Sequence, residues 1–418
     1  MEKNWKQNAV VFIGSQAVSL IGSAIVQYAV MWHITLTTQS GLYATLFIVC
    51  GFLPTLLLSP FGGVWADRYN RKMLIVLADG AIALSTLILA LLYLAGYQEL
   101  WLLFLVAGIR ALGGAVQTPS VNAMLPDIVP VEALTRVNGI YSSVQSVASL
   151  LSPVLALLLL ERTSLGAVFF VDVGTAALAI VILLVFLKLP ARKIEQTGAP
   201  NYFLELKEGF SYIRQNRYLI HFFVYFAVLL VMMSPLAFLT PLQVSRTFGA
   251  DAWRLNAIEI VFSVGMILGG LLMTVWSGLK NRLHTIAVSC IITAVCTILM
   301  GLPTSFWLYT LWMGICGLVM SLFNTQAMVV LQERVQADVM GRVFGVMSMI
   351  SSSVAPLAML AYGPLADVVS IETLMLITGI AMLITSIFMV FDKPLLEVGK
   401  RPLQVGEAVD RPDLDGYN

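Results

Sequence analysis

The sequence predicts an all-α integral membrane protein with 12 transmembrane helices in two six-helix bundles. Hydrophobic residues make up 59% of the 418 residues, and charged residues only 11%, far below the roughly 25% of an ordinary soluble domain. Twelve apolar runs follow one another, each near the ~20 residues that a membrane-crossing helix needs. Sequence features of the first half also recur in the second. These three observations exclude a soluble protein with a large core.

The apolar runs give the expected spans in order. They cover residues 9–36, 41–65, 73–96, 100–123, 138–160, 164–188, 218–244, 255–279, 285–303, 305–330, 342–366 and 371–391. The first run is too long for the apolar core of a signal peptide, about 7–15 residues, so we expect it to remain as the first span.

The charged segments divide the chain into four parts. Residues 1–188 form the expected first bundle, and residues 218–391 the second. The charged interval 189–217 is predicted to be a cytoplasmic linker, with a surface helix over residues 204–218. Residues 392–418 are predicted to be a cytoplasmic tail.

Lysine and arginine predict the orientation. Of the 24, 20 lie in segments on the same side as the N-terminus, three lie in the opposite loops, and Arg110 lies within a span. The positive-inside rule then places both termini in the cytoplasm. The net charge of +1 gives no reason to expect a nucleic-acid partner.

The sequence contains no motif that is typical of an enzyme active site or of a metal site. The cysteines lie inside apolar runs without metal-ligand spacing, at Cys50, Cys290, Cys296 and Cys316. We expect them to be reduced packing residues, with no metal site and no disulfide framework.

Two offsets relate the halves. Gly108-Ile-Arg110 aligns with Gly314-Ile-Cys316 at an offset of 206, and Asn70-Arg71 aligns with Asn281-Arg282 at an offset of 211. Repeated halves are typical of transporters whose substrate site lies near the membrane midplane between the repeats.

The turn between the second and third spans carries a motif. It reads Gly63-Gly-Val-Trp-Ala-Asp67-Arg68-Tyr-Asn70-Arg71-Lys72, and it resembles the signature loop G-x-x-x-D-R-x-G-R-[RK] of the major facilitator superfamily. The matching positions are Gly63, Asp67, Arg68, Arg71 and Lys72. Asn70 replaces a glycine, and we expect it to adopt the same left-handed backbone. The resemblance implies a cytoplasmic gate that closes against the start of span 11 near Arg342; the alternative is a basic turn that only fixes topology.

Ionisable side chains inside a span are costly, at least about 2.5–3.5 kcal/mol, so each needs a partner or a function. Arg110-Ala-Leu-Gly113-Gly114 resembles the span-4 motif R-x-x-Q-G, which is linked in that family to proton coupling, with Gly113 in place of the glutamine. We assign proton coupling to Asp79, Arg110 and Glu259. For Asp172 we expect a structural hydrogen-bonding role.

Two structural alternatives stay open for the proton-coupling residues. Arg110 could form a purely structural pair with Asp79. Glu259, only about four residues into its span, could be a rim carboxylate paired with Arg254 or Arg246.

Polar side chains at helical spacing predict a substrate cavity. In the superfamily, spans 1, 4, 7 and 10 line the cavity, so the resemblance implies polar faces on these spans. The serines are more often interhelical hydrogen-bonding residues. The candidates for cavity residues are Gln16, Gln27, Gln117, Gln145, Tyr225 and Asn324.

Within the superfamily, the chain most resembles bacterial macrolide-efflux-like drug exporters. The resemblance rests on Ser15-Gln16-Ala-Val-Ser-Leu20, on Gly51-Phe-Leu-Pro54 and on Thr118-Pro119. It implies a monomeric antiporter, not an enzyme, in the bacterial inner membrane. Its partners would be the lipid bilayer, protons and a small amphipathic substrate such as a macrolide. No cofactor is implied, because the proton gradient would supply the energy for export by alternating access.

The sequence leaves other functions open. A lipid, lysophospholipid or siderophore transporter would share the fold. An importer of a polar nutrient is disfavoured because the candidate cavity holds few charges, and a sensor is disfavoured because no soluble domain is appended.

Overall fold

The computed structural model describes residues 5–187, 202–276, 278–279, 281–302, 305–336, 339–392 and 395. Within these residues the protein is helical and contains no strand. The helices are α1 (Trp5–Thr38), α2 (Gly41–Arg68), α3 (Arg71–Leu94), α4 (Leu100–Ile128), α5 (Val131–Arg162), α6 (Leu165–Phe186), α7 (Tyr202–Gln215), α8 (Arg217–Phe238), α9 (Thr240–Thr247), α10 (Ala252–Val275), α11 (Arg282–Met300), α12 (Phe306–Arg334), α13 (Met340–Val368) and α14 (Ile371–Phe391).

The predicted membrane spans are confirmed. Among the described residues, 12 helical segments are long and apolar enough to cross a membrane. The predicted surface helix corresponds to α7. The tail beyond Asp392, apart from Leu395, and linker residues 189–201 lie outside the described residues.

The seventh predicted span differs from the structure, because residues 218–244 are not one helix. The chain ends α8 at Phe238 and starts α9 at Thr240. Pro241 lies in the first turn of α9, and it has no N–H to continue the hydrogen-bond ladder of α8. A proline at the start of a new helix removes a donor that would be unsatisfied there anyway.

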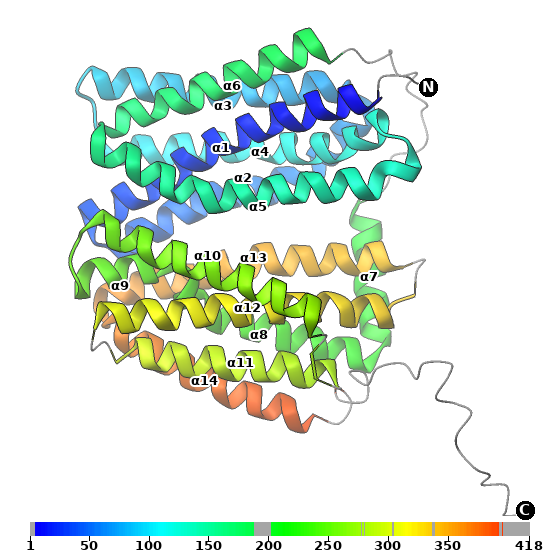
Figure 1. Cartoon of the computed structure of the whole chain (residues 1–418), viewed down its shortest axis with the longest axis vertical. Coiled ribbons are helices and arrows are strands. Elements are labelled where there is room, and N and C mark those ends of the chain that lie inside the picture. Colours follow the sequence, from blue (N-terminus) through cyan, green and yellow to red (C-terminus); the bar gives the residue numbers. More distant parts are fainter. Residues whose placement is uncertain are drawn as a thin grey trace, which may run out of the picture.

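The long helices form two layers. Helices α1 to α6 pack mainly with one another, and so do α8 to α14, while α7 crosses the ends of α8 and α13 (Figure 1). We call the end of the molecule at which α7 lies and α1 begins the linker end. The end at which α1 stops at Thr38 is the far end. Between the layers, α2 packs on α13 and α5 packs on α10.

Among the described residues, the hydrophobic core that combines both bundles lies toward the far end. One large core there combines residues of both bundles, such as Ile34 and Phe169 with Leu236 and Ile258. In the linker half, the bundles have separate cores: Ile75 and Met124 belong to a core made of the first bundle, and Phe323 to one made of the second bundle together with Ile213 of α7.

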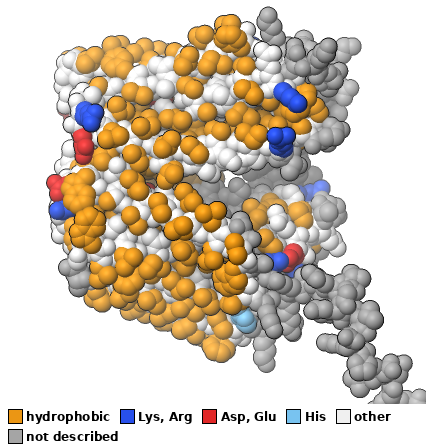
Figure 2. Space-filling model, in the orientation of Figure 1, with side chains coloured by type: hydrophobic (Ala, Val, Ile, Leu, Met, Phe, Trp, Pro, Cys, Tyr) orange, Lys and Arg blue, Asp and Glu red, His pale blue; other side chains and the backbone are white. Residues whose placement is uncertain are grey.

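A hollow separates the bundles in the linker half, as the space-filling view shows (Figure 2). Polar side chains are exposed in mid-helix on helices of both bundles: Ser142, Gln145 and Ser149 of α5, Asn324 of α12, and Ser348, Ser351 and Ser352 of α13. Polar side chains within a membrane protein are kept where water or protein partners reach them, not against lipid. We therefore expect these side chains to face the hollow and to make it the polar compartment of the molecule.

Hydrophobic side chains are spread over the visible outer surface, and charged ones are few (Figure 2). Large apolar side chains on different helices are more than half exposed, for example Leu84, Val181 and Leu271. A soluble monomer rarely shows an apolar surface of this extent. A surface of this kind is suited to contact with the hydrocarbon chains of a lipid bilayer.

The repeat predicted from the sequence has a structural counterpart. The Asn70 side chain caps the start of α3 by accepting from the Met73 N–H at 3.2 Å, and Asn281 caps α11 through the Leu283 N–H at 3.0 Å. The arginine after each asparagine then pairs with an acid in the next helix of its bundle: Arg71 with Asp127 at 2.8 Å and Arg282 with Glu333 at 2.5 Å.

The expected left-handed backbone at Asn70 is wrong. Asn70 has φ −66° and ψ 109°, an extended conformation suited to a helix N-cap. Its side chain replaces the glycine by capping α3, and the turn needs no residue with positive φ at this position.

Candidate functional site

Arg110 and Asp172 form the centre of a buried polar network in the first bundle. The Arg110 Nη1 forms an ion pair with Asp172 Oδ2 and donates to Thr86 Oγ1 at 2.6 Å. Thr86 donates to the same Asp172 oxygen at 3.0 Å, and Ser23 donates to the other oxygen at 3.0 Å. Asp172 is fully buried, and both of its carboxylate oxygens have donors.

This network rules out, in this structure, the alternative pairing of Arg110 with Asp79 that the sequence left open. Asp172 makes the hydrogen bonds that we expected, but it is also the counter-ion of the span-4 arginine, which sequence reasoning missed. An arginine in a bundle needs a counter-ion, and both acids were available within neighbouring spans. The missing signal is the rotation of α3 and α6 about their axes, which composition does not determine.

Asp79 of α3 forms a second buried centre. Its Oδ1 accepts from Gln117 Nε2 at 2.5 Å and from Ser19 Oγ at 3.2 Å. Its Oδ2 is buried and has no hydrogen-bond partner. Within the described part of the chain, no lysine or arginine pairs with Asp79. Among the described residues the carboxyl group is thus held by neutral donors only, and one of its oxygens accepts no hydrogen bond.

One face of α1 contacts both centres. Ser19 and Ser23, four residues apart and therefore on the same side of the helix, donate to Asp79 and Asp172 respectively. Gln16 lies one turn earlier and is buried, and its Nε2 has no partner. The predicted polar stripe of span 1 is present, and its serines bind the acids.

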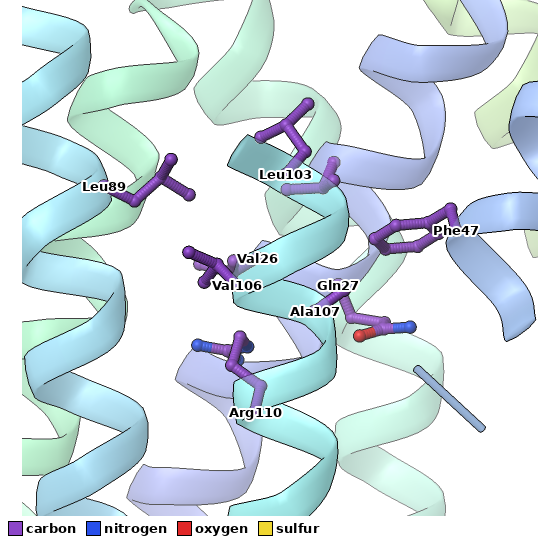
Figure 3. Close-up of a pocket in the computed structure, with 9 residues that line it drawn as sticks. Val26, Gln27, Phe47, Leu89, Leu103, Val106, Ala107 and Arg110 are labelled. Atoms are coloured by element: carbon purple, nitrogen blue, oxygen red, sulfur yellow. The ribbon is translucent and has the colours of Figure 1, made fainter. Parts of the chain in front are cut away.

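A small pocket lies next to Arg110 (Figure 3). Seven of its lining residues are apolar, and Gln27 and Arg110 are the two polar ones: Val26, Gln27, Val30, Phe47, Leu89, Leu103, Val106, Ala107 and Arg110. Figure 3 shows the Arg110 guanidinium at one end of the apolar lining, contributed by α1 to α4. Gln27 is brought to the same pocket, as a cavity residue would be.

Glu259 of α10 is partly buried. The two predicted rim partners are engaged elsewhere: Arg254 pairs with Asp251 at 3.4 Å, and Arg246 pairs with Asp367 at 2.7 Å. The pairing of Glu259 with Arg254 or Arg246 is therefore not formed in this structure. Within the described residues, Glu259 makes no ion pair, and it lies in electrostatic range of Tyr28 of α1 across the bundle interface.

The remaining predicted cavity residues separate into two groups. Gln145 and Asn324 are exposed at mid-helix, and Gln145 lies beside Tyr141, one turn earlier on α5. Tyr225 lies elsewhere, next to Asp392 at the end of α14. The structure does not bring Tyr225 to Gln117 or Gln145.

The motif between α2 and α3 fastens the linker end of the first bundle. Arg71 donates to the carbonyl oxygens of Ala66 at 2.8 Å and Ala123 at 2.6 Å. Lys72 donates to the Leu187 carbonyl oxygen, just after α6, at 2.8 Å. Arg68 is exposed, and Gly63 has open space around it. The Asp67 side chain lies outside the described part of the structure.

The gate is predicted to close near Arg342. In this structure Arg342 pairs with a residue of α7 instead. Its Nε lies 3.1 Å from Glu208 Oε2 of α7. A Cβ on Gly209 would lie 2.9 Å from the Arg342 carbonyl oxygen, so α7 packs closely on the start of α13.

Comparison with known proteins gives the family. The model of the Major Facilitator Superfamily matches residues 10–359. The chain is 30% identical to macrolide efflux protein A of Streptococcus pyogenes over 386 residues, which cover 91% of this chain and 95% of that protein. It is 26% identical to multidrug resistance protein MdtG of Citrobacter koseri, over 63% of this chain and 62% of that protein.

Solved structures share the fold. A bacterial homologue of the human lysosomal transporter Spinster, solved in an inward-facing and unoccupied conformation, superposes with a TM-score of 0.67 over 96% of this chain and 100% of that chain, at 16% identity. Twelve helices of the described part of the chain are long and apolar enough to cross a membrane, and with its transporter relatives this makes the protein a multi-pass protein of the bacterial inner membrane. The chain belongs to the Major Facilitator Superfamily, and it is a membrane transporter rather than an enzyme.

Proposed function

We propose that the protein is a proton-coupled antiporter that exports amphipathic drugs, macrolides among them, by alternating access. The relatives named for macrolide efflux and multidrug resistance support the substrate class. The polar, mostly uncharged hollow fits a substrate that is held by apolar contacts and hydroxyl or amide hydrogen bonds.

The observation that carries the proton-coupling proposal is the environment of Asp79. Its carboxyl group is buried, has neutral donors on one oxygen and none on the other. A charged carboxylate in such a place is unfavourable unless a cation joins it. We therefore assign to Asp79 the uptake of a proton in one state and its release in another.

Asp172 and Arg110 have a different part in this proposal. They neutralise each other, so the network is fixed and separates the Asp79 centre from the apolar pocket. Glu259, without an ion-pair partner among the described residues, is the second proton-binding candidate. It faces the bundle interface, where the surroundings of the side chain change as the bundles rock.

The proposed orientation follows the distribution of lysine and arginine, which makes the linker end cytoplasmic. The conformation then has its hollow open to the cytoplasm, ready to bind substrate from inside. In the opposite state, Asp67, Arg68 and Arg71 of the gate would close the cytoplasmic end on the start of α13, after Arg342 leaves Glu208.

A resistance assay tests this function. The protein would be expressed in a bacterium that lacks its own drug pumps, and the inhibitory concentrations of macrolides, tetracyclines and cationic dyes would be measured with and without a protonophore. We expect raised resistance to macrolides that the protonophore removes. Resistance to none of these compounds, from well-expressed protein, would contradict drug export and direct attention to lipid and siderophore substrates.

A further inference from the structure

We infer that Asp367 and Arg246 form a clamp at the far end that holds the two bundles together and is the counterpart of the gate between α2 and α3. The clamp consists of Asp367 of α13, Arg246 of α9, and the segment Gln39–Leu42, which ends the α1–α2 turn and begins α2. Arg246 and Asp367 belong to the second bundle, and Gln39–Leu42 to the first.

Asp367 binds the start of α2. Its carboxylate accepts from the Gly41 N–H at 2.7 Å, the Leu42 N–H at 2.9 Å and the Ser40 hydroxyl at 2.7 Å. The first N–H groups of a helix have no partner within the helix, and a negative charge there is favoured by the helix dipole. A residue of the second bundle thus supplies the N-terminal cap of a helix in the first.

Arg246 strengthens the same contact. It donates to Asp367 Oδ1 and to the Ala366 carbonyl oxygen, at 2.7 and 2.6 Å, and it also donates to the Gln39 carbonyl oxygen of the other bundle. One arginine therefore neutralises the clamping carboxylate and binds the opposite chain segment directly.

The helix backbones below the clamp are in close contact. A Cβ added to Gly41 would lie 2.1 Å from the Gly363 carbonyl oxygen, and one added to Gly363 would lie 1.6 Å from Thr45 Oγ1. Thr45 itself donates to the Met359 carbonyl oxygen at 3.1 Å. Helices that meet at glycines with this little space have to separate if the far end is to open.

The sequence of the clamp repeats that of the gate. Gly363-Pro-Leu-Ala366-Asp367 ends α13 just as Gly63-Val-Trp-Ala66-Asp67 ends α2, with the aspartate one residue before the last residue of each helix. The two helices run in opposite directions and pack on each other. Asp367 therefore meets the start of α2 at the far end, while Asp67 lies toward the start of α13 at the linker end.

The clamp thus stabilises the conformation that is open at the linker end, and opening of the far end requires Asp367 to leave the start of α2. This role in transport rests on the alternating access proposed above. The contact itself does not, and its effect on conformation can be measured without any substrate.

Hydrogen–deuterium exchange of the full chain in lipid nanodiscs tests the clamp. In Asp367→Ala, peptides covering residues 39–46 and 359–368 should exchange about tenfold faster, as expected from losing charge-assisted hydrogen bonds. Peptides covering residues 140–150 and 340–352, in the linker half of α5 and α13, should exchange more slowly, because release of the far end allows the linker end to close.

The opposite signs at the two ends separate a shift in conformation from a loss of stability, which raises exchange at both ends. Glu372→Ala is the matched control: Glu372 accepts from Thr247 at 2.8 Å at the same end, but both residues belong to the second bundle. This control should leave residues 39–46 unchanged. Gly41→Ala, which wedges the two helices apart without removing a charge, should reproduce the pattern of Asp367→Ala.

Unchanged exchange of residues 39–46 in Asp367→Ala would overturn the clamp. Faster exchange at both ends in Asp367→Ala and Gly41→Ala would also overturn it, since the contact would then act only on stability. Failure of the macrolide resistance assay, with the exchange pattern as expected, would instead contradict the proposed substrate and leave the clamp standing.

Discussion

Arg110 of α4 forms its ion pair with Asp172 of α6, and Asp79 of α3 is left with neutral hydrogen-bond donors. The two acids of the first bundle are therefore not equivalent. Asp172 pairs with the Arg110 cation, and each of its two carboxylate oxygens accepts a hydrogen bond. These contacts fix the charge and the position of Asp172. Asp79 has a free oxygen and no cation among the described residues, which is the arrangement that a reversible proton site requires.

The Arg110–Asp172 pair predicts a strong dependence of stability on both partners. Asp172→Asn leaves the arginine charge buried without a counter-ion, and breaking such a pair costs about 3–5 kcal/mol. We expect thermal unfolding of Asp172→Asn in detergent to occur at a markedly lower temperature than that of the wild-type protein.

The matched control for this pair removes both charges. Arg110→Met combined with Asp172→Leu should recover much of the lost stability, because well-packed apolar residues can replace a buried pair. A double variant as unstable as the sum of the single variants would show that the two residues act independently, against the network described here.

Glu259 predicts a transport defect without a folding defect. Because this side chain has no ion-pair partner in the described structure, Glu259→Gln removes no salt bridge and should leave the melting temperature unchanged. Macrolide resistance of cells that express Glu259→Gln should fall severalfold. Glu161→Gln, at an exposed acid near the end of α5, is the control and should keep full resistance; equal resistance of both variants would exclude Glu259 from coupling.

The hollow predicts which positions a water-soluble thiol reagent reaches. Gln145→Cys should react rapidly with an impermeant maleimide added to inside-out vesicles and slowly in right-side-out vesicles. Ile258→Cys, within the core shared by the bundles at the far end, should react slowly from both sides. Rapid labelling of Gln145→Cys only from outside would reverse the proposed orientation.

Asn70 predicts a cap effect that is independent of transport chemistry. Asn70→Ala loses the acceptor for the Met73 N–H and should destabilise the protein by about 1 kcal/mol, while Asn70→Asp should be close to neutral. Chemical denaturation of the three proteins measures the difference. If Asn70→Gly were clearly more stable than the wild-type protein, the turn would prefer the left-handed glycine conformation after all.

The sequence was sufficient to predict the membrane-spanning helices, since hydrophobic length decides them and a bilayer leaves few other solutions. The sequence did not lead us to predict the break between α8 and α9. Residues 218–244 are a single apolar run, and the effect of Pro241 on the helix is not visible in the hydropathy. Helix rotation was the main difficulty in the site. The sequence singled out Asp79 and Asp172 as ionisable residues within spans, but only packing decided that Asp79, and not Asp172, lacks the arginine.

The Asp367 clamp was missed for a related reason. Asp367 and Arg246 lie at helix ends, where charged side chains are common and carry little information by themselves. The contacts of Asp367 with residues 40–42 join positions more than 300 apart, and Arg246 contacts Gln39 from 207 positions away, so neither spacing nor hydropathy indicates these contacts. Only the repeated Gly-x-x-Ala-Asp at the ends of α2 and α13 could have suggested that these two positions are related.

The most direct test of proton-coupled export is the release of protons from purified protein on addition of a macrolide, measured with a pH-sensitive dye in weakly buffered detergent. The wild-type protein should release protons when the drug binds. Asp79→Asn should bind the same drug with similar affinity, measured by tryptophan fluorescence, and release none or far fewer. Drug binding without proton release by the wild-type protein, or unchanged release by Asp79→Asn, would contradict the assignment of the proton site to Asp79.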